Sequence, residues 1–556
     1  MSADDYNPGV PDLSTVEGRR LYNSQVAIST IHEDILSKIF LINSHLDFDH
    51  PHCPSQTSRR TSQVFHKWRA FTLSFPMMWA ASLDFSDPLA WVNEVVLRAG
   101  PVPLNIIFPP FPIDSPPIVV NVDQRTLRFY IHQVQSMMKT PNARDGLNTL
   151  AIALSLAPRS HTFIAKIHPA SWKSLVENLC DSKMPSLHTL SVGVGFGDPD
   201  GYFTLPKALF SDCTPRLRNL ALYGCNADIS SPIFHTLTTL SISNLGSRSA
   251  LAPARWLELL SGLPELEDLV LTYAFLEIRN FDWDMPVVIN SVILDEGTTP
   301  PVVELTKLKY LKLVGNLEPC TQFFVNLRLP PSCGMDIECK HSRADDGYQD
   351  MVSKLQRQLD AWENGGHNPV ESIRLSANRS NLGFKNKRPG PEGDDTLSLY
   401  WFPSFSPDAD ASPFFFLPFL SMLSIISLGV VDVDLDFHGS NPFTDSQIIQ
   451  LLLPFTNLQT LRVTENKTFD RLFFIFNDYE ERHETALLPA LRLLSFEYIY
   501  FGNHPANPRY SGLLHFLRRR SEAGFPISTV KVRQCGGFLE VEVKRLGISV
   551  DWGLLT

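Results

Sequence analysis

Cysteine and basic charge are both scarce in this sequence. Eight cysteines occur in 556 residues, and no two of them form the Cys-x-x-Cys pair used by zinc sites and redox centres. Lysine and arginine number 48 against 59 acidic residues, which gives a formal charge of −11 at pH 7. A general nucleic-acid-binding protein needs a basic surface, so we expect no nucleic-acid partner. The low cysteine content likewise excludes a disulfide scaffold.

Secretion and membrane signals are also lacking. The first residues carry neither the basic nor the apolar segment of a secretory signal, so we expect an intracellular protein of the cytoplasm or nucleus. One uncharged run, residues 411–431, is long enough to span a bilayer. It contains two prolines and four serines, and its flanks are Asp410 and Asp432 instead of lysine or arginine. We therefore predict no membrane segment and no membrane partner.

Catalytic motifs are absent from the sequence too. It contains no phosphate-binding loop, nucleophile elbow, dinucleotide fingerprint or His-Glu-x-x-His motif. Residues 45–53 gather histidines, aspartates and Cys53, but no second ligand group stands at a spacing typical of a zinc finger. Asp432, Asp434 and Asp436 alternate along one expected strand without an acid–base partner. We predict a non-catalytic protein that uses neither a cofactor nor a metal.

An internal repeat is the strongest positive signal. The pattern Leu-x-x-Leu-x-Leu, with Ile, Val or Phe allowed, recurs eleven times. The first apolar residues of the repeats are Leu147, Leu187, Leu217, Leu237, Leu266, Leu308, Val370, Leu423, Leu458, Leu491 and Ile527. Because the side chains of a strand alternate between its two faces, the second and third apolar residues share one face. The pattern predicts a short strand at each of these places.

Five of the repeats carry asparagine or cysteine three positions after the third apolar residue. These residues are Cys225, Asn316, Asn378, Asn466 and Cys535. The position is typical of leucine-rich repeats, and a polar or thiol side chain there is expected to turn inward and bond to backbone groups of the neighbouring coil. Asn378 and Asn466 also begin glycosylation sequons. Their inward position and the missing signal peptide argue against glycosylation.

Segments with helical periodicity lie between the expected strands. They are residues 256–263, residues 513–520 and the set Val352, Leu355, Leu359 and Trp362. Strands that alternate with helices form a parallel sheet covered by those helices. We therefore predict an α/β fold, a leucine-rich-repeat solenoid over residues 147–556 with a parallel concave sheet and convex helices. Residues 377–396 are rich in Asn, Gly, Pro and charge, and are expected to form a disordered loop.

A different module precedes the repeats. Residues 1–27 are expected to be a disordered acidic tail, and residues 84–146 a linker into the first repeat. Residues 28–83 contain two helical patterns, the first capped by Ser29 or Thr30. The apolar face of the first helix consists of Ile31, Ile35, Leu36, Ile39, Phe40 and Ile42. The second helix carries Val64, Trp68 and Phe71 among basic residues.

This helical module resembles the F-box of mushroom-type fungal F-box proteins, a family whose repeats are degenerate and leucine-rich. The family pattern begins Leu-Pro-x-Glu-Ile-Leu and later contains Val-Cys-x-x-Trp-Arg. The matching residues are Glu33, Ile35, Leu36, Val64, Trp68 and Arg69. The sequence departs from the pattern at Ile31-His32, which replaces Leu-Pro, and at Phe65, which replaces Cys. Residues 91–104 also look like the link of that family into its first strand.

The resemblance implies a substrate-recruiting subunit of a cullin-based, SCF-type ubiquitin ligase. The F-box would bind a Skp-type adaptor, which connects it to the cullin core of the ligase, and the repeats would hold a protein target. The implied adaptor-binding residues are Ile31, Ile35, Leu36, Ile39, Phe40, Val64 and Trp68. Two alternatives stay open. These apolar residues form the internal core of the module, or the chain is a leucine-rich-repeat scaffold that no longer docks the adaptor because of Ile31-His32.

The residues beside the apolar positions of each repeat are expected to face away from the core. In the early repeats they are small and neutral: Thr189, Ser191, Asn219, Ala221, Tyr223, Thr239 and Ser241. The later repeats present a largely basic stripe: Tyr310, Lys312, Arg374, Arg462, Lys531 and Arg533. Arginine pairs with carboxylate or phosphate, so our hypothesis is a target with an acidic or phosphorylated segment. The alternative is an ordinary solvated surface.

Overall fold

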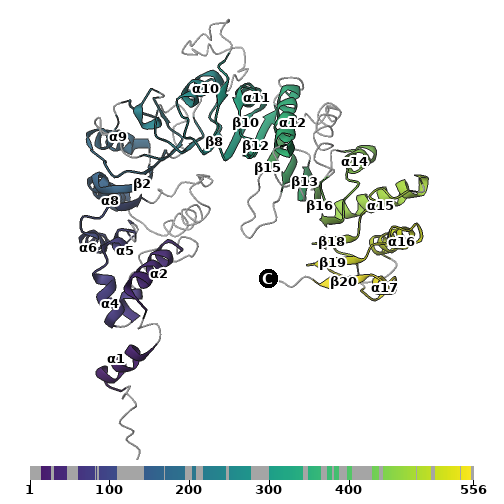
Figure 1. Ribbon diagram of the computed structural model, residues 1–556, viewed down its shortest axis with the longest axis horizontal. Helices are drawn as coiled ribbons and strands as arrows, with labels where there is room; N and C mark the ends of the chain where they lie inside the picture. The colour runs from purple at the N-terminus through teal and green to yellow at the C-terminus, as the bar shows by residue number, and fades with distance from the viewer. Residues whose placement is uncertain are drawn as a thin grey trace, which may run out of the picture. The chain divides into compact units, whose positions relative to one another are not determined.

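The structure is a computed structural model of the chain (Figure 1). It describes residues 14–26, 31–46, 60–64, 66–81, 83, 85, 87–108, 143–167, 169–194, 203–207, 209, 217–228, 230–245, 250–276, 300–341, 348–364, 372–378, 381–386, 397–403, 429–437, 443–483, 485–502, 507–538 and 540–552. The chain divides into two compact units, Met1–Ala250 and Leu251–Thr556, called here the amino-terminal and the carboxy-terminal unit. The division falls inside the predicted repeat region.

A short helix lies in the expected disordered tail. Helix α1 (Val16–Gln25) begins after Thr15, whose Oγ1 accepts a hydrogen bond of 2.9 Å from the backbone N–H of Gly18. Glu17 in the first turn also suits the positive end of the helix dipole. The prediction of disorder over residues 1–27 was therefore wrong for residues 16–25, because the cap and the first-turn acid stabilise a helix there.

The helical module has a small aromatic core. It consists of α2 (Glu33–Leu46), the helical residues 60–64, α4 (His66–Leu73) and α5 (Pro76–Ala81). Leu36, Phe40 and Met78 are buried, and Trp68 packs edge-on against Phe40 with ring centroids 5.0 Å apart. Trp79 is fully buried, and its indole N–H donates a 2.8 Å hydrogen bond to the Thr72 carbonyl. The two predicted helices of this module are confirmed.

The amino-terminal unit contains a parallel sheet with the strand order β1-β2-β3-β5-β7. The strands are β1 (Leu104–Phe108), β2 (Ser160–Ile167), β3 (Thr189–Val194), β5 (Asn219–Tyr223) and β7 (Thr239–Ser243). The helices that follow the module are α6 (Leu89–Ala99), α8 (Ala143–Leu156) and α9 (Trp172–Asp181). Two short strands, β4 (Thr204–Leu205) and β6 (Asn226–Ala227), pair with each other.

Two predictions about this unit were wrong. The expected linker 84–146 contains α6 and β1, and β1 pairs in parallel with β2, so the sheet begins before residue 147. The repeat at Leu147, Leu150 and Ile152 lies in α8 and forms no strand. Leucines three residues apart also share one face of a helix, so the pattern alone does not separate the two structures.

The carboxy-terminal unit contains a larger sheet, with the strand order β8-β10-β12-β15-β14-β13-β16-β17-β18-β19-β20. The strands are β8 (Asp268–Thr272), β10 (Tyr310–Asn316), β12 (Gly334–His341), β13 (Ser372–Asn378), β14 (Asn381–Asn386), β15 (Leu397–Pro403), β16 (Asp432–Phe437), β17 (Thr460–Thr464), β18 (Leu493–Glu497), β19 (Thr529–Arg533) and β20 (Ser549–Trp552). A separate pair is formed by β9 (Val303–Glu304) and β11 (Leu327–Arg328).

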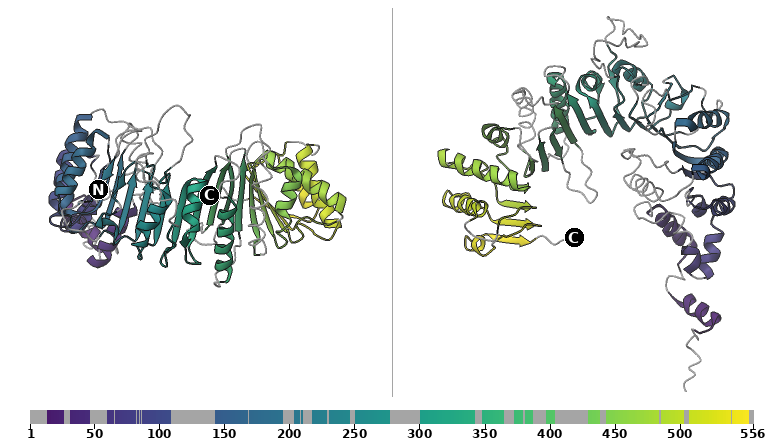
Figure 2. Two further views of the ribbon diagram at one scale, coloured as in Figure 1. Left: turned by 90° about the horizontal axis from the view of Figure 1, so that it is seen from above. Right: turned by 180° about the vertical axis from the view of Figure 1, so that it is seen from behind.

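Helices of this unit connect successive strands, as the sequence predicted. They are α10 (Pro253–Ser261), α11 (Leu317–Val325), α12 (Tyr348–Asn364), α14 (Asp445–Leu452), α15 (Asn466–His483), α16 (Pro508–Glu522) and α17 (Glu540–Lys544). Figure 1 and the right-hand view of Figure 2 show α14–α17 on one side of strands β16–β20. In the described parts of the chain, no helix combines the length and apolar character needed to cross a bilayer. The uncharged run at 411–431 lies mostly outside them.

One strand runs against the others. Strand β14 is antiparallel to both of its neighbours, and its pairing with β13 ends at Asn378 opposite Asn381. It lies inside residues 377–396, so the prediction of a disordered loop was wrong for this strand. A hairpin built on β13 satisfies the backbone of residues 381–386, whose alternating Leu382 and Phe384 suit a strand.

The strands of the repeat pattern bury their apolar residues completely. Eight of the eleven predicted repeats coincide with strands β3, β5, β7, β8, β10, β17, β18 and β19. All three apolar residues in each of the eight are at most 2% exposed. Strand β13 covers the last two apolar residues of the repeat at Val370, and the repeat at Leu423 lies outside the described residues. The predicted strands and their inward-facing residues are confirmed at these eight places.

The same turn follows six of the strands. The residue directly after each strand has a left-handed backbone, with φ between 48° and 84°: Gly224, Asn244, Tyr273, Glu465, Tyr498 and Gln534. The residue after it is the predicted inward position. Cys225 donates its thiol proton to the Val192 carbonyl on the adjacent strand, and burial raises the pKa of this thiol to about 12. Asn466 Oδ1 and Cys535 Sγ accept from the backbone N–H groups of Tyr500 and Ile499, which confirms the inward bonding for these three.

Candidate functional site

Helix α2 has two apolar faces, one buried and one exposed. Leu36 and Phe40, four residues apart, are 2% exposed and form the core of the helical module. Ile35, Ile39 and Ile42 lie on another face and are 55%, 38% and 55% exposed. Val64 is equally exposed on the following helical segment. We call these four exposed residues the apolar stripe. The sequence grouped buried and exposed residues together, and the structure separates them.

The start of α2 also differs from the expectation. The helix begins at Glu33, and the His32 ring Nδ1 accepts a 3.3 Å hydrogen bond from the backbone N–H of Asp34. The His32 carbonyl accepts from the N–H groups of Ile35 and Leu36. The expected caps, Ser29 and Thr30, lie outside the described residues. His32, which departs from the F-box pattern, therefore supplies an acceptor to the first turn of this helix.

The basic residues of the later repeats lie in register with acidic ones. A single row runs across the sheet of the carboxy-terminal unit from β10 to β20, one residue per strand. In strand order, the row contains Lys312, Asp336, Ser398, Lys385, Arg374, Asp434, Arg462, Ser495, Lys531 and Asp551. Five members are basic and three are acidic, so the row keeps a formal excess of positive charge. Lys385 and Arg374 pair in register on strands β14 and β13.

Three bases of this row form ion pairs with their neighbours. Lys312 Nζ lies 2.5 Å from Asp336 Oδ2, which also accepts a 3.4 Å hydrogen bond from the Tyr310 hydroxyl. Arg462 Nη1 lies 3.9 Å from Asp434 Oδ2.

The third pair joins Lys531 Nζ to Asp551 Oδ2 over 3.7 Å. Arg533 is exposed two residues beyond the row on β19, opposite Glu497 of β18. The predicted basic stripe is thus partly neutralised, and its role in target binding stays a prediction.

The early strands differ from the small, open surface that was expected. Ser191, Ala221, Tyr223 and Ser241 are all buried. Lys166 of β2 pairs in register with Gly193 of β3, which pairs in turn with Tyr223 of β5. Lys166 is 5% exposed and its ammonium lies 5.2 Å from the Tyr223 ring centre, and burial lowers the pKa of Lys166. This lysine has no signal in the sequence, because β2 lacks the leucine pattern.

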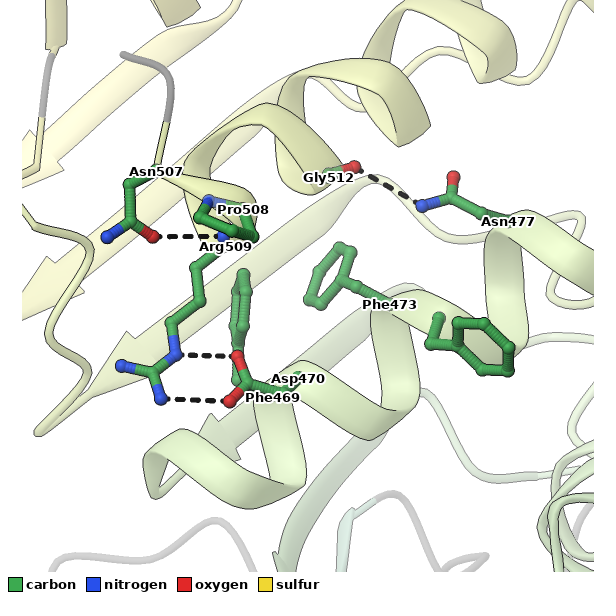
Figure 3. A pocket seen from close by; sticks show the side chains of 9 residues that line it. Phe469, Asp470, Phe473, Asn477, Asn507, Pro508, Arg509 and Gly512 are labelled. Carbon is green, nitrogen blue, oxygen red and sulfur yellow. Dashed lines mark hydrogen bonds and ion pairs between the residues drawn. The ribbon is translucent and has the colours of Figure 1, made fainter. Parts of the chain in front are cut away.

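A cavity opens between helices α15 and α16 (Figure 3). It has a volume of about 570 Å³. Its lining residues are Phe469, Asp470, Phe473, Phe474, Asn477, Asn507, Pro508, Arg509 and Gly512. Of its three phenylalanines, Phe474 is 63% exposed, whereas Phe469 and Phe473 are 0% and 3% exposed. Phe473 packs edge-on against Phe516. Nothing in the sequence pointed to this site, because its walls come from two helices separated by a strand.

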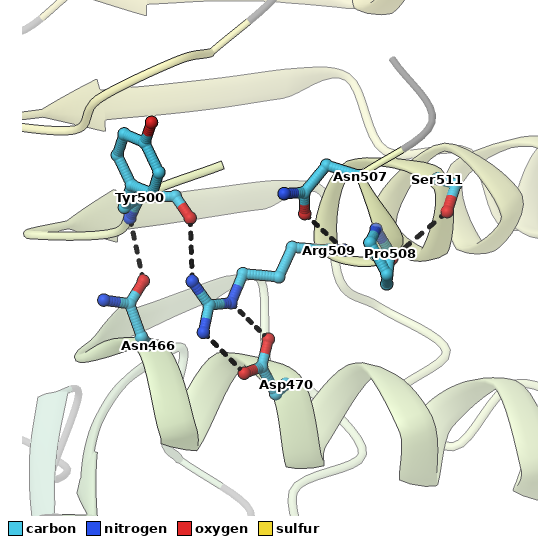
Figure 4. Close-up of polar contacts among 7 residues, drawn as sticks. All are labelled: Asn466, Asp470, Tyr500, Asn507, Pro508, Arg509 and Ser511. Carbon is cyan, nitrogen blue, oxygen red and sulfur yellow. Dashed lines mark hydrogen bonds and ion pairs between the residues drawn. The ribbon is translucent and has the colours of Figure 1, made fainter. Parts of the chain in front are cut away.

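The mouth of the cavity is held by Arg509 (Figure 4). Its guanidinium makes a two-point ion pair with Asp470, at 2.5 Å from Nε to Oδ1 and 2.8 Å from Nη2 to Oδ2. A third bond of 3.0 Å runs from Nη1 to the Tyr500 carbonyl. The hydrogen bond to Asp470 raises the pKa of Arg509. Both charges at the mouth are therefore satisfied within the protein.

Comparison of the sequence with protein-family models and with curated proteins finds no match. Within the described part of the chain, no group of His, Cys, Asp and Glu side chains is arranged to hold a metal ion. The loop at 45–53, considered above as a metal site, lies almost wholly outside that part. The geometry of this chain is therefore the basis for its functional interpretation.

Proposed function

We propose that this chain is a substrate-recruiting F-box subunit of a cullin-based ubiquitin ligase. The apolar stripe is the observation that carries the proposal. Three isoleucines at helical spacing remain exposed on α2 although the module has an aromatic core of its own. Exposed apolar residues lined up on one helix face are typical of a surface that docks into the groove of a partner. A Skp-type adaptor would bind there.

The repeats would form a leucine-rich-repeat solenoid that holds the target. Support comes from eight buried Leu-x-x-Leu-x-Leu strands, from the left-handed residue after six strands, and from the inward Asn or Cys at three of the following positions. A leucine-rich repeat requires a buried strand, a turn and an inward polar or thiol residue of this kind, repeated along a parallel sheet. The face with the charged row would contact an acidic or phosphorylated segment, because five residues of the row are basic and three are acidic.

Adaptor capture tests the proposal. The tagged chain is co-purified with a fungal Skp-type adaptor, beside the double variant Ile35→Asp, Ile39→Asp. Both side chains are exposed, so the variant should melt at the same temperature as the parent while capture falls more than tenfold. Burying an isoleucine stabilises a complex by about 1.5–3 kcal/mol, and 1.4 kcal/mol corresponds to a factor of about ten.

A matched control is Leu97→Asp, which changes an equally apolar and exposed residue on α6, outside the stripe. It should keep full capture. Capture retained by the double variant, or no capture by the parent, would overturn the proposal. In the second case the chain would be a repeat-based binding scaffold, and His32 at the start of α2 would be the first residue to restore to proline.

A further inference from the structure

Three basic side chains follow one another along the edge of the amino-terminal sheet at which its strands begin. His161 is the second residue of β2, and His188 and Arg218 directly precede β3 and β5. The His188 backbone N–H donates to the His161 carbonyl at 2.8 Å, and the Arg218 N–H donates to the His188 carbonyl at 2.9 Å. The two imidazole rings stack with their centroids 5.2 Å apart. We call these three residues the basic edge.

No acid neutralises the basic edge within the described part of the chain. None of its three side chains forms an ion pair there, and the charges that act on His188 are those of His161 and Arg218. Burial, followed by these two charges, lowers the pKa of His188. The corresponding position of the carboxy-terminal unit differs, because Lys309, directly before β10, pairs with Glu267, directly before β8, over 2.6 Å. Bases without a counter-ion attract an anion.

His161 can donate to such an anion only after it has taken up a proton. Its Nδ1 lies 3.2 Å from the Ser186 carbonyl, which can only accept, so Nδ1 carries the hydrogen of the neutral ring. The other nitrogen, Nε2, then holds a lone pair and becomes a donor when the ring is protonated. His161 and Arg218 are exposed and His188 is half-buried, so the basic edge faces solvent.

The donors of the basic edge suit a phosphate monoester. Arg218 Nη1 donates to the Thr236 carbonyl at 3.3 Å, which leaves the other N–H groups of the guanidinium for a ligand. A phosphate monoester has three terminal oxygens and up to two negative charges. It therefore matches one guanidinium and two imidazolium rings better than a carboxylate, which has two oxygens and one charge.

We infer that His161, His188 and Arg218 bind a phosphate monoester, and that binding takes up a proton at His161. The site uses no residue of the apolar stripe or of the charged row, and it does not depend on the ligase proposal. The monoester belongs either to a small molecule or to a phosphorylated protein segment, and both present the same chemistry to the basic edge.

Inorganic sulfate tests the site on the full chain, because it keeps two negative charges over the whole range in which histidine titrates, whereas a phosphate monoester itself titrates at about pH 6. Binding is measured by titration calorimetry at constant ionic strength, with chloride as the reference. Sulfate should bind about tenfold more tightly at about pH 5.5 than at about pH 8, because the protonated rings add charge-assisted hydrogen bonds. Equal affinity at the two pH values, or no binding beyond that of chloride, would overturn the inference.

Variants then locate the anion. The double variant His161→Gln, His188→Gln should bind sulfate at low pH as weakly as the parent does at high pH, and its affinity should not change with pH. Arg218→Gln should weaken binding at both pH values. His235→Gln, at an exposed histidine of the same unit, is the control and should bind as the parent does. A double variant that keeps the pH dependence of the parent would show that sulfate binds elsewhere, which also overturns the inference.

Two phosphate probes distinguish the sources of the monoester. They are glycerol 2-phosphate and a tripeptide with phosphoserine between two glycines, each compared with its unphosphorylated form at about pH 6, where the protonated rings are still populated. Tighter binding of glycerol 2-phosphate supports a small-molecule ligand, and tighter binding of the peptide supports a phosphorylated protein segment. Binding of neither probe by a chain that binds sulfate would overturn the assignment to a phosphate monoester.

Discussion

Arg520 and Glu480 form an ion pair that is almost completely enclosed, with Nη1 2.9 Å from Oε1 and exposed fractions of 1% and 6%. It joins α16 to α15, the two helices that line the cavity. Arg520 also donates to the carbonyls of Leu488 and Phe525, at 2.7 Å and 3.2 Å. Burial raises the pKa of Glu480 although Arg520 opposes the shift. The charges are thus held in a place where neither would be stable alone.

Removing one partner of this pair should be costly. We expect Glu480→Ala to lower the free energy of unfolding by about 3–5 kcal/mol, because the Arg520 charge stays buried without its counter-ion. Urea denaturation measures the change. The neighbouring Glu481, half-exposed and paired with Arg519, is the control, and Glu481→Ala should cost less than about 1 kcal/mol. Equal losses in the two variants would contradict the expectation.

The left-handed turns predict a stabilising substitution. Tyr498 has φ 58°, and a side chain with a Cβ pays about 1–2 kcal/mol for this backbone. Its side chain is 60% exposed, so little packing is lost when it is replaced. Tyr498→Gly should raise the free energy of unfolding by about 0.5–1 kcal/mol in urea denaturation. A lower stability would mean that the tyrosine ring contributes more than the backbone costs.

Gly224 holds the position after β5 that Tyr498 holds after β18, and its replacement should have the opposite effect on stability. A Cβ at Gly224, where φ is 63°, would lie 2.8 Å from the Val194 carbonyl oxygen. Gly224→Ala should therefore destabilise the amino-terminal unit by more than about 1 kcal/mol. Thermal melting of this variant beside Tyr498→Gly gives shifts of opposite sign. Two shifts of the same sign would contradict the shared role of the two positions.

Lys166 should make stability depend on alkaline pH. Its folded-state pKa lies below the ordinary value of 10.5, so the unfolded chain holds the proton more tightly. The charged amine therefore destabilises the fold below its folded-state pKa, and stability rises as the pH climbs from there to 10.5. Lys166→Met removes this rise. The measurement is the difference in unfolding free energy between parent and variant at pH 7.5 and pH 10.

The difference should shift in favour of the parent at the higher pH. Lys173→Met serves as the control, because this lysine is 87% exposed on α9 and should show no such shift. Parallel pH profiles of the parent and Lys166→Met would count against a lowered pKa.

Charge reversal tests the binding face of the carboxy-terminal unit. Arg374→Glu with Arg462→Glu should abolish capture of an acidic or phosphorylated target, because it reverses the charge at two of the five basic positions of the charged row. Asp434→Asn, which removes the acidic neighbour of both arginines, should strengthen capture. Proteins retained by each tagged variant are compared by quantitative mass spectrometry, with and without phosphatase treatment. Unchanged retention in the double variant would refute the acidic-target hypothesis.

Local patterns predicted the strands well, because burial on one face leaves a period of two in the sequence. The failures have the same physical origin. In α8, leucines spaced by three residues fit a helix face as well as a strand. In α2, Ile35 and Leu36 are adjacent and equally apolar, and only the position of Met78 and Trp68 decides which of them is buried.

The pairing of charges depended on distant parts of the chain. Asp336, Asp434 and Asp551 neutralise their basic neighbours through the register of strands that lie tens of residues apart. Single strands of the sequence show bases such as Arg462 and acids such as Asp434 separately, without the register that pairs them. The cavity was hidden for the same reason, since its walls form only when α15 and α16 lie together.

The recurring left-handed turn has a consequence for how such a chain changes over evolutionary time. After each of the six strands the backbone makes the same left-handed turn, which places the second residue after the strand toward the interior. A stretch that runs from one such turn to the next therefore starts and finishes with matching geometry. Duplication or loss of one stretch would leave the joints on either side unchanged, so the length of the array can vary while the individual folding unit is preserved.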